Sequence, residues 1–438
     1  MKKVYLLSLG CPKNLVDNEI LSTLLQEKEF EIVNDPTESE IILISTCAFI
    51  RLAVEETIES ILELAHLKQP YQKLVVIGCL VERYKDQLPL LLPEVDAWIG
   101  IKSLPYLPDW LEKNSLPKLS LEGPGWQKAD YFKRIPSNPF TAYVKIAEGC
   151  SNHCTFCTIP KIRGPLKSRP IEEIVTEVEQ LVKQGIKEIV LVAHETSAYG
   201  LDLYGKASLT SLLKTLDKTG VTWLRILYVH PQRAFSLIEA FNACSHLTPY
   251  LDIPIQHIDT EVLKSMGRGM KEKDLREIIL FLKKHLPNVK LRTTVMVGFP
   301  TETEEAFKKL LSFLEEVAFD HLGVFKYSAE EGTAAFKLGD KVPEEVKDER
   351  FEIVMNLQQE IARKKHQNYV GTKETVFIDR LEEGYVAVGR TPWQAPEIDG
   401  EVYITKGEAL LGEIKKVKII DAYDYDLIGI ITGPSNNF

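Results

Sequence analysis

Three cysteines in the middle of the chain carry the strongest chemical signal. They form a CxxxCxxC motif of Cys150, Cys154 and Cys157, here called the central triple. Clustered thiolates bind soft metals and iron–sulfur clusters, and three of them can hold a four-iron cluster with one iron open to another ligand. The alternative is zinc bound with His153, but structural zinc sites usually combine two separated ligand pairs, and His153 directly precedes Cys154. The spacing therefore favours an iron–sulfur cluster.

A second set of cysteines, Cys11, Cys47 and Cys79, is here called the N-terminal triple, and its members are 36 and 32 residues apart. Each follows an apolar run that is predicted to be a strand, at residues 4–9, 41–45 and 74–77. Each alone would be typical of a buried core cysteine. Because ligands of open α/β sheets bind beyond the carboxyl ends of the strands, the shared position predicts a second metal cluster. Cys244 has no such pattern and is predicted to be a packing residue.

The elements that must position these cysteines are of the α/β class. In the first third, the strands alternate with helical patterns at residues 14–26 and 53–67, which indicates a parallel sheet. The middle third has six predicted strands separated by helical patterns, which favours an incomplete, TIM-like (β/α)6 barrel. These strands are residues 143–147, 188–193, 224–229, 251–255, 291–297 and 322–327.

The last part of the chain changes its pattern. A helix is predicted over residues 344–369, and five short strands separated by turn signals then predict a small antiparallel β-barrel. The strands are residues 375–379, 385–390, 401–405, 413–420 and 427–431. A proline- and glycine-containing stretch between residues 123 and 139 is predicted to be a linker. The predicted domains are therefore residues 1–125, 136–368 and 370–438.

The composition is that of an ordinary globular protein. Of its 438 residues, 45% are hydrophobic and 26% charged, which excludes a disordered chain, a collagen and a coiled-coil rod. The net charge is −10, whereas a protein that binds bulk nucleic acid usually has a basic excess. No apolar run approaches the ~18 residues of a membrane helix, and the run at residues 4–10 is too short for an export signal. We therefore expect a cytoplasmic protein with reduced cysteines and no membrane partner.

The central motif, with Phe156 before its last cysteine, resembles the radical S-adenosylmethionine (SAM) superfamily. With the N-terminal triple and the C-terminal barrel, nearly the whole chain is similar to the methylthiotransferases of that superfamily. The sequence motifs are most similar to those of the RimO-type branch, which modifies an aspartate of small-subunit ribosomal protein twelve. The matching segments are residues 8–14, 143–149, 252–257, 265–268, 292–300 and 327–333. Departures from the branch stand at Asn18, His194, Glu195, His230 and Thr301.

The resemblance implies two [4Fe–4S] clusters and SAM as cofactors. The central triple would hold the cluster that binds and cleaves SAM, and the resulting radical would remove a hydrogen from the β-carbon of the target aspartate. The N-terminal triple would hold the second cluster, which would deliver the methylated sulfur. The resemblance also implies a reductant such as flavodoxin or ferredoxin, and a ribosomal protein substrate that is either free or on the ribosomal subunit.

Four further residues are predicted to bind SAM. Phe156 would lie against the adenine, while Glu195, Gln256 and Arg292 are expected at strand ends, where a βα barrel places its site. Arg292 would pair with the SAM carboxylate. The structural alternatives are an ion pair for Arg292 and a surface position for Glu195.

Other functions remain open at this point. A tRNA-adenosine methylthiotransferase would use the same chemistry, but residues 370–438 carry seven Lys and Arg against twelve Asp and Glu. This net charge of −5 repels phosphate and suits a basic ribosomal protein, so nucleic acid is not expected as the substrate. The alternatives from other classes are a non-catalytic iron–sulfur scaffold or carrier, which needs no SAM pocket, and a zinc-stabilised binding module.

Overall fold

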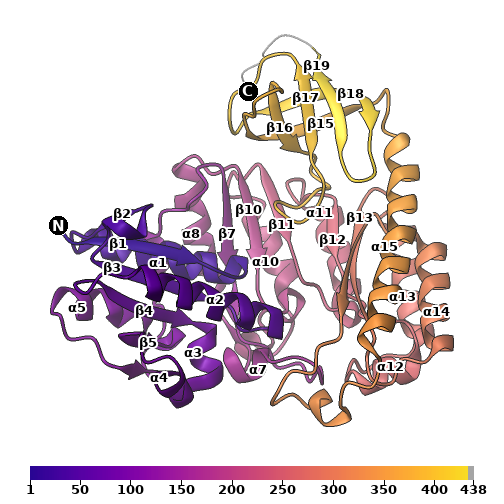
Figure 1. The fold of residues 1–438 in the computed structure, drawn as a ribbon. Coiled ribbons are helices and arrows are strands. Elements are labelled where there is room, and N and C mark those ends of the chain that lie inside the picture. The colour runs from indigo at the N-terminus through magenta and orange to yellow at the C-terminus, as the bar shows by residue number, and fades with distance from the viewer. Residues whose placement is uncertain (433–438) are drawn as a thin grey trace.

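The structure is a computed structural model, and it describes residues 1–432. The last six residues of the predicted C-terminal domain lie outside the described residues. An N-terminal α/β unit and a small C-terminal barrel both lie against a larger central unit (Figure 1). In the described part of the chain, no helix is long and apolar enough to cross a membrane.

The N-terminal unit is a parallel six-stranded sheet in the order β2-β1-β3-β4-β5-β6. Its strands are β1 (Lys3–Ser8), β2 (Glu31–Val33), β3 (Ile41–Thr46), β4 (Lys73–Gly78), β5 (Ala97–Ile99) and β6 (Leu119–Ser120). Its helices are α1 (Pro12–Glu27), α2 (Arg51–Leu67), α3 (Cys79–Tyr84), α4 (Leu88–Leu91) and α5 (Leu107–Glu112). The three predicted strands are confirmed, and every residue of β3 is buried, as expected for a parallel strand covered on both faces. The strands that were not predicted have only two or three residues each.

The central unit contains all six predicted strands, arranged as two parallel sheets in the orders β11-β10-β7 and β12-β13-β14. The strands are β7 (Thr141–Lys145), β10 (Glu188–Val192), β11 (Trp223–Ile226), β12 (Tyr250–Asp252), β13 (Lys290–Val297) and β14 (His321–Lys326). Between the two sheets, Leu224 of β11 forms an isolated bridge with Leu247, which precedes β12, and the amide of Val229 donates to the backbone oxygen of Asp252 at 2.9 Å. A short antiparallel pair consists of β8 (Ala147–Glu148) and β9 (Lys167–Ser168).

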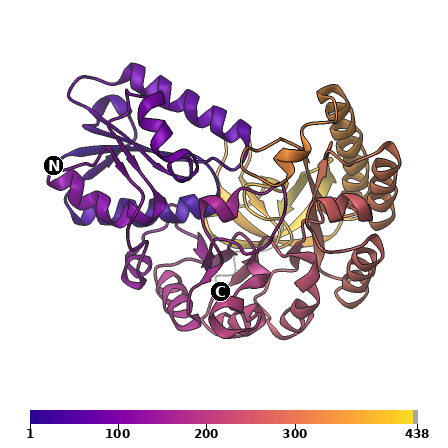
Figure 2. The same ribbon diagram turned by 90° about the horizontal axis from the view of Figure 1, so that it is seen from below.

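Helices form an arc around the outside of these strands (Figure 2). They are α8 (Ile171–Lys183), α9 (Leu201–Tyr204), α10 (Leu209–Leu216), α11 (Ile238–Ala243), α12 (Thr260–Ser265), α13 (Glu272–His285) and α14 (Glu304–Val317). The short helix α7 (Ile159–Ile162) lies instead in the loop after β8, and its Ile162 packs into the core of the N-terminal unit. Helix α14 illustrates why these segments form helices. Its residues Phe307, Leu310 and Leu314 recur at helical spacing and form a buried apolar face. Its first turn is capped by Thr303, whose hydroxyl accepts from the amide of Ala306 at 3.2 Å. The central unit is therefore an incomplete parallel barrel.

The predicted linker is a packed segment that contains the short helix α6 (Lys128–Lys133). Trp126 Nε1 donates to Asp17 of α1 at 2.8 Å. Arg134 is fully buried, pairs with Glu19 of α1, and donates to Glu177 of α8 at 2.7 Å. The connection therefore holds α1 against the central unit.

The long helix α15 (Glu344–Gln367) leads into a closed barrel with the strand order β15-β16-β17-β19-β18. The strands are β15 (Lys373–Arg380), β16 (Ala387–Arg390), β17 (Val402–Lys406), β18 (Ile414–Ala422) and β19 (Leu427–Ile431). All five were predicted, but β17 and β19 are parallel rather than antiparallel. The reason is geometric, because a closed barrel with an odd number of strands cannot alternate in direction all the way round.

The barrel contacts the amino-terminal ends of the central strands. Arg390 of β16 pairs with Glu188, the first residue of β10, and Phe377 of β15 packs against Trp223, the first residue of β11, at 5.4 Å between ring centroids. Lys187 donates to the backbone oxygen of Gly412 at 2.8 Å. The barrel therefore lies at the opposite end of the strands from the loops that carry the cysteines.

A buried histidine in the junction between α15 and the barrel predicts acid sensitivity. Burial lowers the pKa of His366 from 6.5 to about 4. Its stabilising contribution is complete above pH 6.5 and is lost as the pH falls toward 4, because only the unfolded chain takes up the proton. We expect His366→Gln to reduce the loss of unfolding free energy between pH 8 and pH 5 by about 2 kcal/mol, measured by urea unfolding. His285 is exposed, so His285→Gln is the control. An equal loss of unfolding free energy between pH 8 and pH 5 in both variants would contradict the prediction.

Candidate metal centre

The N-terminal triple lies at the carboxyl ends of three adjacent parallel strands. Cys11 directly precedes α1 after β1, Cys47 directly follows β3, and Cys79 begins α3 immediately after β4. Because β1, β3 and β4 are neighbours in the sheet, the three thiols share one edge. This is the placement that the spacing of the strands predicted.

Close approach of the backbones brings two of these loops into contact. Gly10 adopts φ +103°, and a Cβ added there would lie 3.0 Å from Cβ of Cys47. A side chain at this position would force the loops of Cys11 and Cys47 apart, so the glycine forms part of the cradle around the thiols.

Asn14 connects all three strand ends. Its Nδ2 donates to the backbone oxygens of Leu9 at 3.1 Å and Thr46 at 3.0 Å. Its Oδ1 lies 3.7 Å from Sγ of Cys79, a hydrogen-bond distance for sulfur. The sequence reasoning missed this role, although Asn14 stands in the segment 8–14 that was singled out.

The pKa values of the thiols in the N-terminal triple depend on burial, on one another and on two nearby cations. Burial and the neighbouring thiols of Cys11 and Cys47 together raise the pKa of Cys79 to about 11, although the positive charge of Arg163 acts in the opposite direction. Burial acts in the same direction on Cys11, but the positive charges of Lys13 and Arg163, together with backbone hydrogen bonds, outweigh it and lower the pKa of this thiol. Positive charge therefore favours the thiolate, the form that binds metals, at Cys11, whereas burial raises the pKa of Cys47 and of Cys79.

The central triple lies in the loop between β8 and β9, which includes the short helix α7. The loop is closed by a hydrogen bond from the amide of Cys150 to the backbone oxygen of Gly164 at 3.0 Å, and Cys157 donates to the oxygen of Cys154 at 3.1 Å. Arg268 donates from Nη1 to Sγ of Cys154 at 3.5 Å. Burial raises the pKa of Cys157 to about 12, with the thiols of Cys154 and Cys150 adding to the shift. The three thiols of the central triple are therefore also neighbours.

Two of the predicted SAM contacts lie at carboxyl ends of central strands, as expected. Glu195 follows β10, is buried, and pairs with Arg233 at 2.8 Å. Both charges influence the pKa of Cys150, which places them beside the central triple. Glu195 is therefore not the surface acid of the alternative reading. Gln256 follows β12 with φ +68°, a conformation that costs energy for a residue other than glycine and is frequent at functional sites.

Phe156 is partly buried beside a hydrophobic cluster. The cluster includes Met266, Phe299 and Tyr327, and it lies next to the loop of the central triple. Thr155 fixes this loop, since its amide donates to the oxygen of Met266 at 2.9 Å. An aromatic face is therefore present next to the central cysteines.

The expected position of Arg292 is wrong. Arg292 is the third residue of β13 and lies near the amino-terminal end of the strand rather than at its carboxyl end. Its guanidinium pairs with Asp252 at 3.2 Å and with Asp399, from the C-terminal barrel, at 3.5 Å. The ion-pair alternative holds, because two carboxylates already compensate its charge. The strand itself was predicted correctly, but the sequence pattern does not show how far each residue lies from the carboxyl end of the strand.

The fold brings the two triples together across the boundary between the N-terminal and central units. Thr158, next to Cys157, donates to the backbone oxygen of Phe49 at 3.0 Å. Arg163, in the same loop, donates to Sγ of Cys79 at 3.3 Å. The loop of the central triple thus contacts residues next to Cys47 and the thiol of Cys79 itself.

Buried charges surround this boundary. Lys145 pairs with Asp17 of α1 and with Glu148 at 2.8 Å. Lys145 and Arg163 hold the pKa of Glu148 below its usual value in spite of its burial, while burial and Lys13 lower the pKa of His194. Glu148 is therefore ionised and His194 neutral at neutral pH, and the boundary is a network of compensated charges.

The donor sets fit iron–sulfur clusters better than a single zinc ion. Among residues 1–432, no three Cys, His, Asp or Glu side chains converge closely enough to hold one metal ion. Zinc requires ligand atoms within about 2.0–2.3 Å of one point. In a four-iron cluster each thiolate binds a different iron, so three neighbouring but separated thiols suit it.

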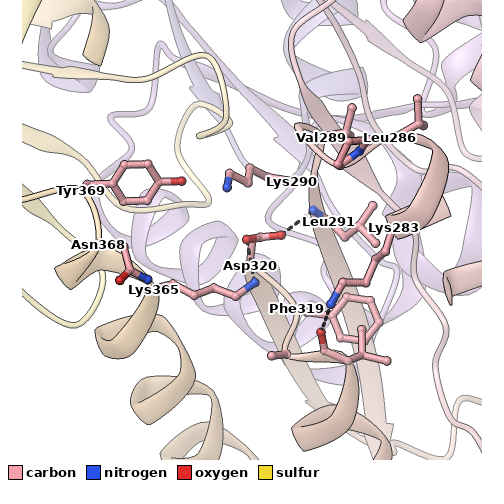
Figure 3. A pocket seen from close by; sticks show the side chains of 13 residues that line it. Lys283, Leu286, Val289, Lys290, Leu291, Phe319, Asp320, Lys365, Asn368 and Tyr369 are labelled. Atoms are coloured by element: carbon pink, nitrogen blue, oxygen red, sulfur yellow. Dashed lines mark hydrogen bonds and ion pairs between the residues drawn. The ribbon is translucent and has the colours of Figure 1, made fainter. Parts of the chain in front are cut away.

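A cavity of about 360 Å³ lies elsewhere, beside the first residues of β13 and β14 (Figure 3). Its charged lining residues are Lys283, Lys290, Lys365 and Asp320. Lys365 pairs with Asp320 at 2.7 Å, and the carboxyl ends of α13, α14 and α15 line the cavity. Helix carboxyl ends carry partial negative charge, which explains the lysines without an anionic ligand. The cavity is at the opposite end of the strands from the cysteines.

Comparison with protein families identifies three regions of the chain. Residues 3–100 match the uncharacterized protein family UPF0004, residues 144–314 match the radical SAM superfamily, and residues 370–431 match the TRAM domain. The cysteines of the N-terminal triple lie in the first region and those of the central triple in the second.

Curated relatives match nearly the whole chain. A protein of Geotalea uraniireducens is 44% identical over 440 residues, covering 98% of both chains. A protein of Aquifex aeolicus is 45% identical over 433 residues, covering 98% of this chain and 96% of that protein. Both relatives are named ribosomal protein uS12 methylthiotransferase RimO.

Among solved structures, the radical SAM methyltransferase TsrM from Kitasatospora setae, with tryptophan and a SAM analogue bound, is similar with a TM-score of 0.53 and 15% identity. The match covers 74% of this chain and 73% of TsrM. The cobalamin-dependent enzyme OxsB gives a TM-score of 0.51 at 12% identity, over 82% of this chain and 56% of OxsB. At such identities these similarities show a shared fold.

Proposed function

The chain belongs to the RimO family of ribosomal protein uS12 methylthiotransferases, and from this membership we propose that it attaches a methylthio group to uS12. The observation that carries the proposal is identity of 42–45% over essentially the full length of several relatives of that name. The cofactors are SAM and two [4Fe–4S] clusters. The target on uS12 is proposed to be the β-carbon of an aspartate.

The two triples are proposed to divide the work. Cys150, Cys154 and Cys157 would hold the cluster that binds SAM, and the N-terminal triple would hold the cluster that presents the sulfur. With SAM bound, the central cluster supplies one-electron cleavage of SAM, a chemistry that can remove hydrogen from an unactivated carbon. The contacts of Thr158 and Arg163 with the N-terminal unit would keep the two centres on either side of the substrate.

Other residues would orient SAM and keep water out. Glu195 lies beside Cys150 and pairs with Arg233, so its carboxylate is placed to accept from polar groups of SAM. Phe156 offers an aromatic face for the adenine, and Gln256, which follows β12, is partly exposed. Arg268, which touches Cys154, is a contact that sequence reasoning missed, although its segment 265–268 was singled out.

The remaining partners follow from charge and redox chemistry. The C-terminal barrel, with its net charge of −5, would bind uS12, because ribosomal proteins that contact RNA are rich in Lys and Arg. An electron donor such as flavodoxin or ferredoxin would reduce the clusters. The seven free cysteines fit a reducing compartment, so we propose that the enzyme works in the cytoplasm, where ribosomal subunits are also found.

The direct test is the intact mass of uS12 from cells with and without the gene. We expect the wild-type cells to show the mass increment of one methylthio group in place of hydrogen, and the deletion strain to lack it. Fragment spectra would place the group on one aspartate. Reaction of the purified enzyme with free uS12 and with small subunits would identify which form is the substrate.

An unchanged uS12 mass would contradict the proposal. The search would then move to methylthio groups on tRNA nucleosides, where the same chemistry would produce a different product. A protein that carries iron but never cleaves SAM would instead indicate a scaffold or carrier.

A further inference from the structure

Arg163 occupies an unusual position between the two triples. It follows α7, is almost completely buried, and lies beside Gly164, whose backbone oxygen closes the loop of the central triple. Its Nη2, however, donates to Sγ of Cys79 at 3.3 Å, in the other triple. A side chain from the central loop is thus a direct hydrogen-bond donor to a thiol of the N-terminal triple.

The guanidinium is held in this orientation by the N-terminal and central units together. Nη1 pairs with Asp17 of α1 at 3.0 Å and with Glu148 at 3.2 Å, and Nη2 also donates to Oδ1 of Asn14. A planar guanidinium with several fixed partners cannot rotate away from the sulfur without breaking them. The contact with Cys79 is therefore part of a rigid network.

Hydrogen bonds to cluster sulfurs and nearby positive charge both stabilise the reduced, more negative state of an iron–sulfur cluster. We propose that Arg163 is a positioning residue that donates to the Cys79 thiolate and raises the reduction potential of the cluster in the N-terminal triple. The inference rests on the proposed function, since it requires a cluster at this site. It assigns to one residue of the SAM-binding loop an influence on the sulfur-presenting centre.

The potential can be measured on one cluster at a time. Replacing all three cysteines of the central triple by alanine leaves only the N-terminal cluster, whose reduction is followed by electron paramagnetic resonance during a redox titration. In this background we expect Arg163→Met to lower the equilibrium constant for reduction of the cluster about tenfold. This corresponds to a negative shift of the reduction potential by about 59 mV for a one-electron couple. Arg163→Gln, which removes the charge but keeps a donor group, should shift the potential in the same direction by a smaller amount.

Arg134→Met is the matched control. Arg134 is equally buried and also joins α1 to the central unit, through Glu19 and Glu177, but none of its hydrogen bonds is to a cysteine. This variant should leave the potential of the N-terminal cluster unchanged. In the reciprocal background, with the N-terminal triple replaced by alanine, Arg163→Met should leave the central cluster unchanged.

The outcomes are distinguishable. A folded, iron-replete Arg163 variant with the parental potential would overturn the inference, as would an equal shift in Arg134→Met. Selective loss of the N-terminal cluster in both Arg163 variants, but not in Arg134→Met, would show that Arg163 is needed to hold the cluster and would overturn its assignment as a residue that adjusts the potential. Failure of the otherwise wild-type protein to bind a cluster at the N-terminal triple would overturn the proposed function itself.

Discussion

Replacing Cys154 by alanine is expected to abolish both SAM cleavage and the methylthiolation of uS12. Cys154 is one of only three thiols in its loop, and its sulfur accepts from Arg268 at 3.5 Å. Two thiolates cannot hold the cluster that binds SAM in the proposed mechanism. Release of 5′-deoxyadenosine under reducing conditions and the mass of uS12 measure the two losses separately.

Cys244→Ala is the matched control for this variant. Cys244 is also a free cysteine, but it is buried at the end of α11, away from both triples. Its replacement removes the same atoms and should leave both activities within a few-fold of wild type. Methylthiolated uS12 in a strain whose only copy carries Cys154→Ala would show that the central triple does not have the proposed role.

Replacing Cys47 by alanine is expected to separate the two activities. Methylthio transfer should fall below detection, because the N-terminal triple would lose one of its three thiolates, while SAM cleavage should stay within a few-fold of wild type. The fold should tolerate the change, since the hydrogen bond from Thr57 at 3.0 Å uses the backbone oxygen of Cys47 rather than its side chain. Product mass and 5′-deoxyadenosine are measured on the same samples.

Two results would contradict this prediction. Continued methylthiolation by Cys47→Ala would remove the N-terminal triple from the reaction. Simultaneous loss of SAM cleavage in a folded variant would mean that the two triples act as one unit, against the division of work proposed here. The iron content of the variant distinguishes the second result from a general failure to assemble the clusters.

Much of the site could be predicted because parallel strands impose a simple rule on the sequence. Cys11, Cys47 and Cys79 each follow an apolar strand, and neighbouring parallel strands bring their carboxyl ends to one edge. The positions of Glu195 and Gln256 follow from the same rule in the central unit. In each case the local sequence pattern was sufficient, because a residue that directly follows a parallel strand lies at the carboxyl edge of the sheet.

This rule does not predict how far along a strand a residue lies or which distant segments contact it. Arg292 belongs to a correctly predicted strand, but its partner Asp399 comes from a loop of the C-terminal barrel. The stretch predicted as a linker contains Trp126 and Arg134, which pack between α1 and the central unit. Neither contact leaves a periodic signal, because each depends on how separate units pack.

The sequence by itself determined the two sets of thiols, the α/β class, the five strands of the C-terminal barrel and the resemblance to methylthiotransferases. Only the tertiary structure decided that the loop of the central triple contacts the N-terminal unit and that Arg163 reaches Cys79 across 84 residues of chain. The physical reason is that hydrophobic periodicity specifies which face of an element is buried. It does not specify which distant side chain will meet that face, and the hydrogen bonds of Thr158 and Arg163 to the N-terminal unit are of this kind.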